Sequence, residues 1–276
     1  MIAIQELMRG DIPPRVRRFV KTVGRGINEF RMINEGDSVL LGVSGGKDSL
    51  SMALALSLRR RWLPIKYELH AVQIEWAEFP LSRASKDQLS NYFEALEIPF
   101  QFLQAHMFPE SFRGKFNCYL CSRNRKRILF DHINRVGINK IALGHHLDDI
   151  IETTLMNLFY HGSFGTMMPV QNFFDGETQI IRPMCRVTEA GVRNISAFLG
   201  LPVVSINCPH KDTNLRSDMK MIIQSLTHKN KQVRENIYRA PWNIITDYLP
   251  EPQNSRTKLD VTAVPEPISA CNSSRS

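Results

Sequence analysis

Apolar positions along the chain switch repeatedly between the spacing of a buried strand and that of an amphipathic helix. The first pattern follows Pro13-Pro14, where apolar residues at 16, 19, 20, 23, 27 and 30 predict a helix that begins at the prolines. From residue 38 onward, short apolar runs predict strands at 38–43, 67–74, 100–103, 140–143 and 179–182. Between them, helical spacing predicts helices at 48–60, 85–96, 122–136, 147–160 and 188–199. This alternation indicates an α/β fold, a doubly wound parallel sheet that binds ligands at the carboxyl ends of its strands.

The alternation ends near residue 162, and less regular segments follow it. Residues 165–176 predict a loop or a hairpin, and residues 212–226 and 230–238 predict two more helices. After residue 250, Pro, Ser, Asn and Thr dominate without an apolar period, which favours a disordered tail. We therefore expect a helical segment at 1–35, a domain at 36–245 and a tail at 250–276, so that helical additions flank the sheet.

Composition excludes several classes of protein. Hydrophobic residues make up 43% of the 276 residues and charged residues 22%, which is enough apolar content for a core and argues against wholesale disorder. No apolar run approaches the ~20 residues of a membrane span, and the first residues lack the pattern of a secretory signal. We therefore expect a cytoplasmic protein without a membrane partner. The net charge of +8 indicates a polyanion as partner.

The segment Ser44-Gly45-Gly46-Lys47-Asp48-Ser49 lies between a predicted strand and a predicted helix. Its glycines let backbone N–H groups approach an anion, and the helix that follows points its positive end at the same place. The serines can donate hydrogen bonds, Lys47 adds a charge for phosphate, and Asp48 can hold Mg²⁺. Leu41 stands where the common nucleotide loop needs glycine, so the motif is not that loop. It resembles instead the SGGxDS signature of the PP-loop ATP pyrophosphatases, which split ATP between its α and β phosphates and form adenylates.

A second cluster, Gly144-His145-His146-Leu147-Asp148-Asp149, follows the strand predicted at 140–143 and opens another helix. If its strand is a neighbour of the strand before the phosphate loop, the two motifs lie side by side. Asp148 or Asp149 can then share Mg²⁺ with the ATP phosphates, and Gly144 and His145 are candidates for the nucleotide site. The alternative is a structural histidine with Asp148 as the helix N-cap. The segment resembles the GHxxDD motif of the tRNA-modifying branch of the same superfamily.

Five cysteines lie at positions 118, 121, 185, 208 and 271. In a reducing cytosol, a close pair more often binds metal or does redox chemistry than forms a disulfide. Cys118 and Cys121 form a C-x-x-C pair just before a predicted helix, which fits a zinc, redox or iron–sulfur site. Cys208 is a third candidate ligand, and three thiolates would leave one position of a tetrahedral metal open. Cys185 is expected to be a small buried residue, and Cys271 lies in the tail.

Basic residues surround the C-x-x-C pair. Between residues 111 and 127 there is no acidic residue, and the basic ones are Arg113, Lys115, Arg123, Arg125, Lys126 and Arg127. Because phosphate neutralisation supplies most of the nonspecific affinity for nucleic acids, we expect these six side chains to bind RNA. Two further basic clusters, Arg59-Arg60-Arg61 and the polar face of the first helix, are either RNA contacts or solvated surface. The basic residues of that helix face are Arg15, Arg18, Lys21 and Arg25.

Taken in order, these motifs resemble the tRNA 2-thiocytidine synthetase (TtcA-type) family over about residues 15–245. The order runs from the phosphate loop through the C-x-x-C pair and residues 144–149 to Ile181-Arg182-Pro183 and Cys208. The resemblance implies an ATP-dependent tRNA sulfurtransferase that adenylates a base, cytidine 32 in that family, after which sulfur displaces AMP at C2. It also implies that residues 44–49 bind ATP and that Cys118, Cys121 and Cys208 hold a [4Fe-4S] cluster.

From these motifs we expect Lys47, Asp48 and Asp149 to be the catalytic residues, with Mg²⁺ on Asp48 and Asp149. We expect tRNA and a sulfur donor, either a cysteine desulfurase or sulfide, as partners, and a homodimer stays open. Cys208-Pro209-His210-Lys211 departs from the family's Cys-Gly-Ser-Gln, so another tRNA position stays open too. Two rival functions remain: a ligase of the lysidine synthetase type, which needs no cysteine trio, and an RNA-binding module with a structural zinc.

Overall fold

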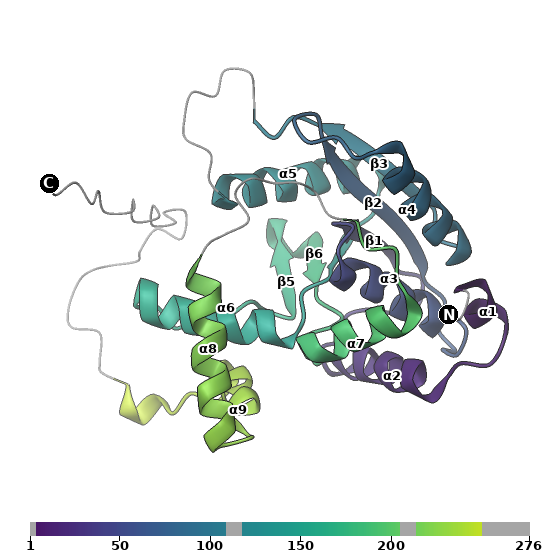
Figure 1. Cartoon of the computed structure of the whole chain (residues 1–276). Helices are drawn as coiled ribbons and strands as arrows, with labels where there is room; N and C mark the ends of the chain where they lie inside the picture. Colours follow the sequence, from purple (N-terminus) through teal and green to yellow (C-terminus); the bar gives the residue numbers. More distant parts are fainter. Residues whose placement is uncertain (1–3, 109–117, 205–213, 250–276) are drawn as a thin grey trace, which may run out of the picture. The chain divides into compact units, whose positions relative to one another are not determined.

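A six-stranded sheet forms the centre of the structure, a computed structural model that describes residues 4–108, 118–204 and 214–249. The strands are β1 (Ser38–Val43), β2 (Glu68–Trp76), β3 (Phe100–Ala105), β4 (Lys140–Leu143), β5 (Val170–Phe173) and β6 (Thr178–Ile181). They lie in the order β3-β2-β1-β4-β6-β5 (Figure 1). Every pairing is parallel except β5 with β6. The predicted parallel α/β sheet is therefore confirmed, with five parallel strands and the antiparallel strand β5 at one edge.

The antiparallel edge follows from a short connection. Only the three-residue turn Phe174–Gly176 and Glu177 separate β5 from β6, whereas parallel neighbours need a crossover of a dozen or more residues. Of the two alternatives predicted for residues 165–176, the hairpin is the one that forms.

Each helix predicted from the apolar spacing is present. The helices are α1 (Ile4–Arg9), α2 (Pro14–Glu29), α3 (Lys47–Arg60), α4 (Arg83–Ala95), α5 (Cys118–Val136), α6 (Leu147–His161), α7 (Glu189–Leu199), α8 (Asn214–Lys229) and α9 (Val233–Arg239). Two details differ from the predictions. The six-residue α1 was not predicted, and α5 begins at Cys118 rather than at Ser122, so the C-x-x-C pair lies in the first turn of the helix rather than before it.

Alternating residues of the strands contribute to two apolar cores, one on each face of the sheet. In β1, Val39 and Leu41 belong to the larger core, which also contains residues of α1, α2, α3, α4, α6 and α7. Leu40 between them belongs to the smaller core, with Leu129 and Ile133 of α5. Figure 1 shows α5 on the opposite side of the sheet from α2, α3 and α7. Helices thus cover both faces, as in a doubly wound fold.

The sheet places the two predicted motifs side by side. β1 pairs with both β2 and β4, and the chain proceeds from β1 outward in one direction through β2 and β3 and in the other through β4 and β6. Such a reversal of strand order opens a crevice at the carboxyl ends of the two central strands. Because Gly42 is paired with Leu143, the segments that follow β1 and β4 begin at the same level of this crevice.

The basic cluster at the end of α3 has a structural role. The Arg60 guanidinium donates to the main-chain oxygens of Leu96 and Glu97 at 3.3 and 3.1 Å, and the Arg61 guanidinium donates to Leu7 at 2.6 Å. Arg59 is 8% exposed and donates to the Asn28 side chain. These bonds connect α3 to the surrounding segments and give the three arginines a structural role.

The chain divides into two compact units, residues 1–241 and residues 242–276. The described part of the second unit contains one short 3₁₀ turn, Thr246–Tyr248. The predicted tail at 250–276 lies outside the described residues. No helix in the described ranges has the length and apolar character needed to cross a membrane.

Candidate active site

The phosphate loop is held in shape by its own two serines. The Ser49 hydroxyl donates to the main-chain oxygen of Gly46 at 3.0 Å and accepts from the main-chain N–H of Ser44 at 3.2 Å. The Ser44 hydroxyl in turn accepts from the N–H of Gly46 at 3.3 Å. Gly46 is the residue before α3 and lacks a side chain that could cap the helix. The first N–H groups of α3 are therefore left for an anion, which the positive end of the helix also favours.

Two glycines let the surrounding chain close on this loop. Gly45 has φ +77°, and a Cβ there would lie 3.2 Å from the main-chain oxygen of Val204. Gly144, at the end of β4, has even less space, since a Cβ would lie 2.9 Å from the main-chain nitrogen of Ser49. The backbone after β4 thus lies directly against the start of α3, a contact that only glycine permits.

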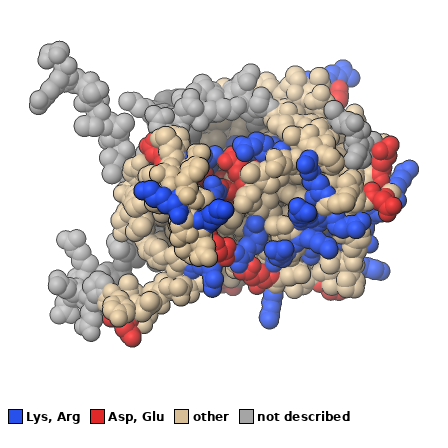
Figure 2. Space-filling view, turned by 60° about the horizontal axis from the view of Figure 1, so that its bottom comes forward, with Lys and Arg blue, Asp and Glu red and all other residues tan. Residues whose placement is uncertain are grey.

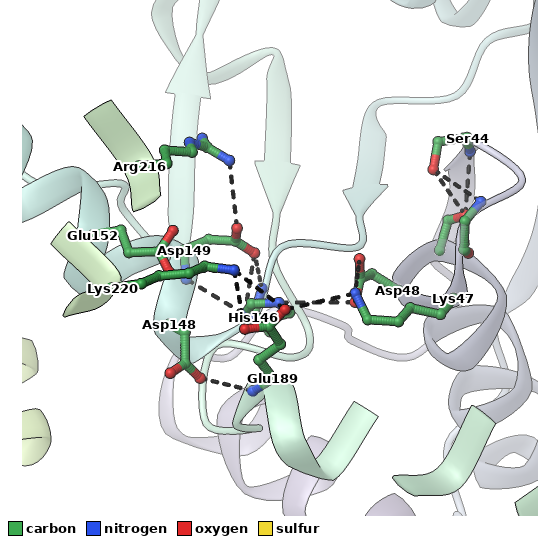
Figure 3. Close-up of polar contacts among 12 residues, drawn as sticks. Ser44, Lys47, Asp48, His146, Asp148, Asp149, Glu152, Glu189, Arg216 and Lys220 are labelled. Atoms are coloured by element: carbon green, nitrogen blue, oxygen red, sulfur yellow. Dashed lines mark hydrogen bonds and ion pairs between the residues drawn. The ribbon is translucent and has the colours of Figure 1, made fainter. Parts of the chain in front are cut away.

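His146 and Asp149 form a capping box at the start of α6. The Asp149 carboxylate accepts from the main-chain N–H of His146 at 2.8 Å, and the Nδ1 atom of His146 accepts from the N–H of Asp149 at 3.4 Å. His146, not Asp148, is therefore the N-cap, and the N-cap role considered for Asp148 is wrong. The other oxygen of Asp149 lies 3.7 Å from Arg216 of α8, and the carboxylate lines the central pocket (Figure 3).

Asp148 points to the other side of α6. Its carboxylate accepts from the main-chain N–H of Glu189, the first residue of α7, at 2.7 Å and forms an ion pair with Arg234 of α9. It is 6% exposed and does not line the pocket. Of the two neighbouring carboxylates considered for Mg²⁺, Asp149 is thus the one that faces the crevice.

Lys47 lies among carboxylates at the rim of the pocket rather than in its wall. Its Nζ atom is 3.2 Å from the Asp48 carboxylate and 3.9 Å from Glu189 (Figure 3). Lys220 of α8 approaches the same Glu189 at 3.1 Å, and Glu152 at 3.9 Å. Burial would raise the pKa of Glu189, but its hydrogen bond and charge interactions with Lys220, supported by Lys47, lower the pKa instead. The carboxylates and lysines here form one mutually neutralising network.

A pocket of about 450 Å³ lies at the crevice. Eight of the predicted site residues line it: Ser44, Asp48, Ser49, Gly144, His145, Asp149, Arg125 and Lys126. One wall is the phosphate loop and the start of α6, and the opposite wall is the first turns of α5. The structure therefore brings residues from distant parts of the sequence to one cavity that combines an anion-binding loop, carboxylates and cations.

Arg182, at the end of β6, is a pocket residue to which sequence reasoning gave no role. It is 5% exposed, and its guanidinium donates to the main-chain oxygen of Met168 and to Gln171. Its Nε atom has no hydrogen-bond partner in the part of the chain that the structure describes. Burial lowers the pKa of Arg182 to about 10, so it still carries its charge at neutral pH. The sequence signal that could have identified Arg182 as a site residue was its place in Ile181-Arg182-Pro183, one of the motifs on which the family resemblance rests.

Burial also shifts the pKa of two other side chains near the pocket. Desolvation and the charge of Arg182 lower the pKa of His145 to about 4, so this histidine is neutral at physiological pH. Desolvation raises the pKa of Glu152, one turn after Asp149, to about 7. Of these two, the sequence indicated His145 as a site residue but gave Glu152 no separate role.

The C-x-x-C pair lies in the first turn of α5, beside the pocket. Cys121 is a half-buried cysteine that precedes Ser122, a residue of the pocket wall. Cys118 lies one turn earlier in the same helix, and Cys208 lies outside the described residues. In the ranges that the structure describes, no three His, Cys, Asp or Glu side chains are grouped to hold a metal ion. Cys185 is fully buried, as predicted, and burial raises the pKa of its thiol to about 12.

The predicted RNA-binding residues divide into three groups. Arg113 and Lys115 lie outside the described residues. Arg125 and Lys126 line the pocket, and burial together with the nearby Arg182 lowers the pKa of Lys126. Arg123 and Arg127 are exposed on α5 outside the pocket wall, and the Arg127 guanidinium donates to Asn124 at 2.9 Å.

Comparison with known proteins agrees with this geometry. A family model described as a PP-loop domain matches residues 17–205. The chain is 36% identical over 246 residues to a tRNA-cytidine(32) 2-sulfurtransferase from Pelobacter propionicus, a match that covers 87% of this chain and 90% of the relative. A protein of the same name from Polynucleobacter asymbioticus is 34% identical over 243 residues, with coverage of 84% and 78%.

A solved structure has the same fold. The U34-tRNA thiolase NcsA from Methanococcus maripaludis, determined with its [4Fe-4S] cluster, superposes with a TM-score of 0.70. The match covers 95% of this chain and 91% of the thiolase, at 20% sequence identity. At that identity the similarity establishes the fold of the chain.

Proposed function

This chain belongs to the PP-loop domain family and, within it, to the tRNA-cytidine(32) 2-sulfurtransferases, and from this membership we propose how its residues divide the reaction. The chain is an ATP-dependent transferase that adenylates cytidine 32 of a tRNA and replaces the oxygen at C2 with sulfur. We assign this reaction to the sheet domain at 36–245. The observation that carries the proposal is the single pocket at which the phosphate loop, Asp149 and the first turns of α5 meet.

We propose that residues 44–49 bind the phosphates of ATP. The free N–H groups at the start of α3 and the hydroxyl of Ser44 supply donors, and Gly144 and His145 form the neighbouring wall. Asp48 and Asp149 line the same cavity, and two carboxylates together with phosphate oxygens are a donor set that suits Mg²⁺. Lys47 exchanges its present carboxylate partners for the pyrophosphate as that group forms.

Arg182 is well placed to stabilise the charge of the adenylated intermediate. The O2 atom of the cytosine attacks the α phosphorus, the bond to the β-phosphate oxygen breaks, and pyrophosphate leaves with its electron pair. Negative charge builds up on the α-phosphate oxygens, and a buried, fixed guanidinium with a free N–H stabilises such charge more effectively than water does. Arg182→Met should therefore lower kcat more than it raises the KM for ATP, whereas Arg182→Lys should recover part of kcat.

Cys118, Cys121 and Cys208 are the residues that we propose to hold a [4Fe-4S] cluster. The start of α5 supports this assignment, because the positive end of a helix favours thiolates, and Cys121 lies half-buried beside the pocket wall. Three protein ligands would leave one iron open, and the cluster would, when bound, supply sulfur in an activated form. Sulfur attack at C2 then breaks the C–O bond of the adenylate and releases AMP.

The six basic residues around the C-x-x-C pair are our candidates for tRNA contact near the reaction centre. Of these, Arg125 and Lys126 have the strongest support, since they line the pocket opposite the phosphate loop. The others are Arg113, Lys115, Arg123 and Arg127. We further propose a cytoplasmic enzyme that receives sulfur from a cysteine desulfurase or from sulfide and works as a homodimer.

Mass spectrometry of tRNA nucleosides from cells that lack this chain tests the function. We expect 2-thiocytidine to disappear, the wild-type gene to restore it, and a Lys47→Ala variant to fail to do so. Loss of a different thiolated base, or of a lysine-bearing cytidine, would instead show another substrate or a ligase.

Iron content tests the cluster independently. Anaerobically purified wild type should be brown and bind iron, Cys121→Ser should be depleted in iron, and Cys271→Ser should match the wild type. A colourless, iron-free and fully active wild type would overturn the cluster assignment without affecting the ATP site.

A further inference from the structure

Helix α2 has a strongly cationic exposed face. Five of its sixteen residues are basic, and all five are exposed: Arg15, Arg17, Arg18, Lys21 and Arg25. Its one acidic residue, Glu29, accepts hydrogen bonds from Arg186 at 2.6 and 2.7 Å. The helix therefore presents an excess of positive charge that its own sequence does not offset.

The two faces of α2 are cleanly separated. At 3.6 residues per turn, the five cations fall within an arc of about 160°, and the buried residues fill the remainder. Those buried residues are Val16, Phe19, Val20, Val23, Gly24, Gly26 and Ile27. Because the whole apolar face packs into the core, none of it is available to insert into a lipid surface, as an interfacial amphipathic helix would require.

None of the five cations forms an ion pair within the described ranges of the chain. Arg15 instead stacks on the ring of Phe198 in α7, with its guanidinium carbon 4.9 Å from the ring centre. Like charges three and four residues apart, such as Arg18, Lys21 and Arg25, destabilise a helix by ~0.2–0.5 kcal/mol per pair. Within the described ranges, none of these side chains forms an ion pair that would offset this repulsion.

A buried charge adds to the positive potential of this face. The Arg59 guanidinium lies directly beneath α2, since a Cβ on Gly24 would meet it at 1.9 Å, and it donates a hydrogen bond to the neutral Asn28. Arg193 on the neighbouring α7 is exposed and is likewise without an ion pair in the described part of the chain. Figure 2 shows Lys and Arg side chains gathered on the face that α2 and α7 share.

A hollow of about 410 Å³ borders α2 on the side of α3. Arg17 and Lys21 line one wall and Arg61 and Trp62 line the other, with Asp11 as the one carboxylate. The Trp62 ring is 46% exposed. Cations beside an exposed aromatic ring suit a nucleic-acid strand. The phosphates bind to the cations, and a ribose or a base packs on the ring.

This face is connected to the active site through one helix. α2 packs against α7, and Glu189 at the start of α7 lies within 3.9 Å of Lys47 in the phosphate loop. At the other end of α2, Arg186 links Glu29 to Glu235 of α9. α2 is thus rigidly joined to the elements that carry the reaction.

We propose that the exposed face of α2, with the adjoining hollow at Trp62, is a second tRNA-binding surface that holds the phosphate backbone away from the target nucleotide. The proposal rests on the proposed function, because it takes tRNA as the substrate. Four of the five cations are arginines, whose planar guanidinium groups bind phosphate with two parallel hydrogen bonds. Such contacts set the position of the RNA and carry no sequence information.

A charge-matched pair of triple variants tests the surface. R18Q/K21Q/R25Q removes three charges from α2, and K66Q/R83Q/R135Q removes three exposed charges elsewhere. With the cluster-bearing enzyme and an unmodified tRNA transcript that contains cytidine 32, we expect the α2 variant to bind at least tenfold more weakly. The dependence of log K on log salt should become shallower by about 2–3, as expected for three lost phosphate contacts. The control should keep the wild-type affinity and slope.

Three further measurements distinguish RNA binding by α2 from damage to the active site and from membrane binding. The KM for ATP and kcat at saturating tRNA should be unchanged in the α2 variant, and R18K/R25K should keep the wild-type salt slope. An α2 variant with wild-type affinity and salt slope would overturn the assignment of α2 as an RNA-binding surface and leave the thiolation function intact.

A wild type that binds no tRNA would overturn the proposed function itself. Loss of binding to phosphatidylserine vesicles, with tRNA binding unaffected, would assign the face to a membrane instead.

Discussion

At the scale of single residues, the site depends on close backbone contact at Gly144. This glycine lets the segment after β4 touch the first turn of α3, because even a methyl group would lie 2.9 Å from the Ser49 nitrogen. We expect Gly144→Ala to force the two segments apart, destabilise the fold by about 1–3 kcal/mol and raise the KM for ATP at least tenfold. Urea unfolding and ATP-dependent thiolation measure the two effects.

The matched control is Gly165→Ala. A Cβ at Gly165 would meet only the Asn157 side chain, at an ordinary 3.7 Å, and the backbone there is not left-handed. This variant should keep the wild-type stability and KM. Equal effects of the two substitutions would show that the contact at Gly144 is not what positions the ATP site.

Glu152 makes stability depend on pH. Burial raises its pKa to about 7, from an ordinary value of 4.5. Between these two pH values, the carboxyl group of the folded protein keeps a proton that the unfolded chain has lost. The stability that this proton contributes is complete below pH 4.5 and disappears as the pH rises through 7. Glu152→Gln removes the titration, and we expect the variant to gain on the order of 2–3 kcal/mol relative to the wild type between pH 5 and 8. Urea unfolding in EDTA at several pH values measures this difference.

His145 makes stability depend on pH in the opposite direction to Glu152, and the same unfolding experiment can separate the two contributions. Burial and Arg182 lower its pKa to about 4, so its contribution to stability is lost as the pH falls from 6.5 toward 4. In the wild type the two slopes oppose one another, and Glu152→Gln should leave a stability that rises with pH in this range. Parallel curves for variant and wild type from pH 5 to 8 would refute the raised pKa of Glu152.

At the scale of elements, the apolar spacing was sufficient to predict the parallel strands and the main helices, because each buries one face or one stripe. The antiparallel β5 could be predicted only as one of two alternatives, since a four-residue strand has too little periodicity. The apolar pattern places the start of α5 four residues late, because its first turn, Cys118–Cys121, carries a motif instead of an apolar stripe. The three arginines at 59–61 resembled an RNA contact. Only the tertiary structure revealed their hydrogen-bond partners, which are main-chain oxygens for Arg60 and Arg61 and the Asn28 side chain for Arg59.

The sequence also could not predict the directions in which neighbouring side chains point. Asp148 and Asp149 are adjacent carboxylates, yet the helical rotation of about 100° per residue directs them to different surroundings. Asp149 faces the pocket, whereas Asp148 joins the start of α7 to Arg234 of α9. The sequence could offer the two as alternatives and could not choose between them.

The contact of Asp148 gives a prediction about how α6, α7 and α9 are held together. Asp148→Asn keeps the shape of the side chain but leaves the partly buried Arg234 without its counter-charge. We expect a loss of about 1–3 kcal/mol in the free energy of unfolding. A double-mutant cycle with Arg234→Met should show coupling, because the second substitution removes the unpaired charge.

Asp87→Asn serves as the control for this cycle. The Asp87 carboxylate faces Arg83 at 4.0 Å on the surface of α4, and such exposed pairs contribute ~0–1 kcal/mol. A cost at Asp148 no larger than at Asp87 would show that the ion pair does not connect the three helices.

At the scale of the whole molecule, the distribution of charge is more informative than its sum. The C-terminal residues 251–276 contain three basic and three acidic side chains, so the net charge of +8 belongs entirely to residues 1–250. Within the described ranges, Lys47 and Lys220 are paired in a network with Glu189, whereas the five cations of α2 lie together on one exposed helix face without an ion pair. The sequence predicted a polyanion partner from the total charge, and the structure shows that five of the cations are gathered on the exposed face of α2.

Removal of the last residues tests this distribution. A chain that ends at Leu249 loses 27 residues and no net charge, so its affinity for tRNA and the slope of log K against log salt should equal those of the full chain. Each phosphate contact changes the slope by about 0.7–0.9, which makes the loss of even one contact measurable. When the truncation is combined with R18Q/K21Q/R25Q, the shallower slope of the α2 variant should be unchanged. A slope that falls on truncation alone would instead show that basic residues of the C-terminal segment contact the RNA despite their acidic neighbours.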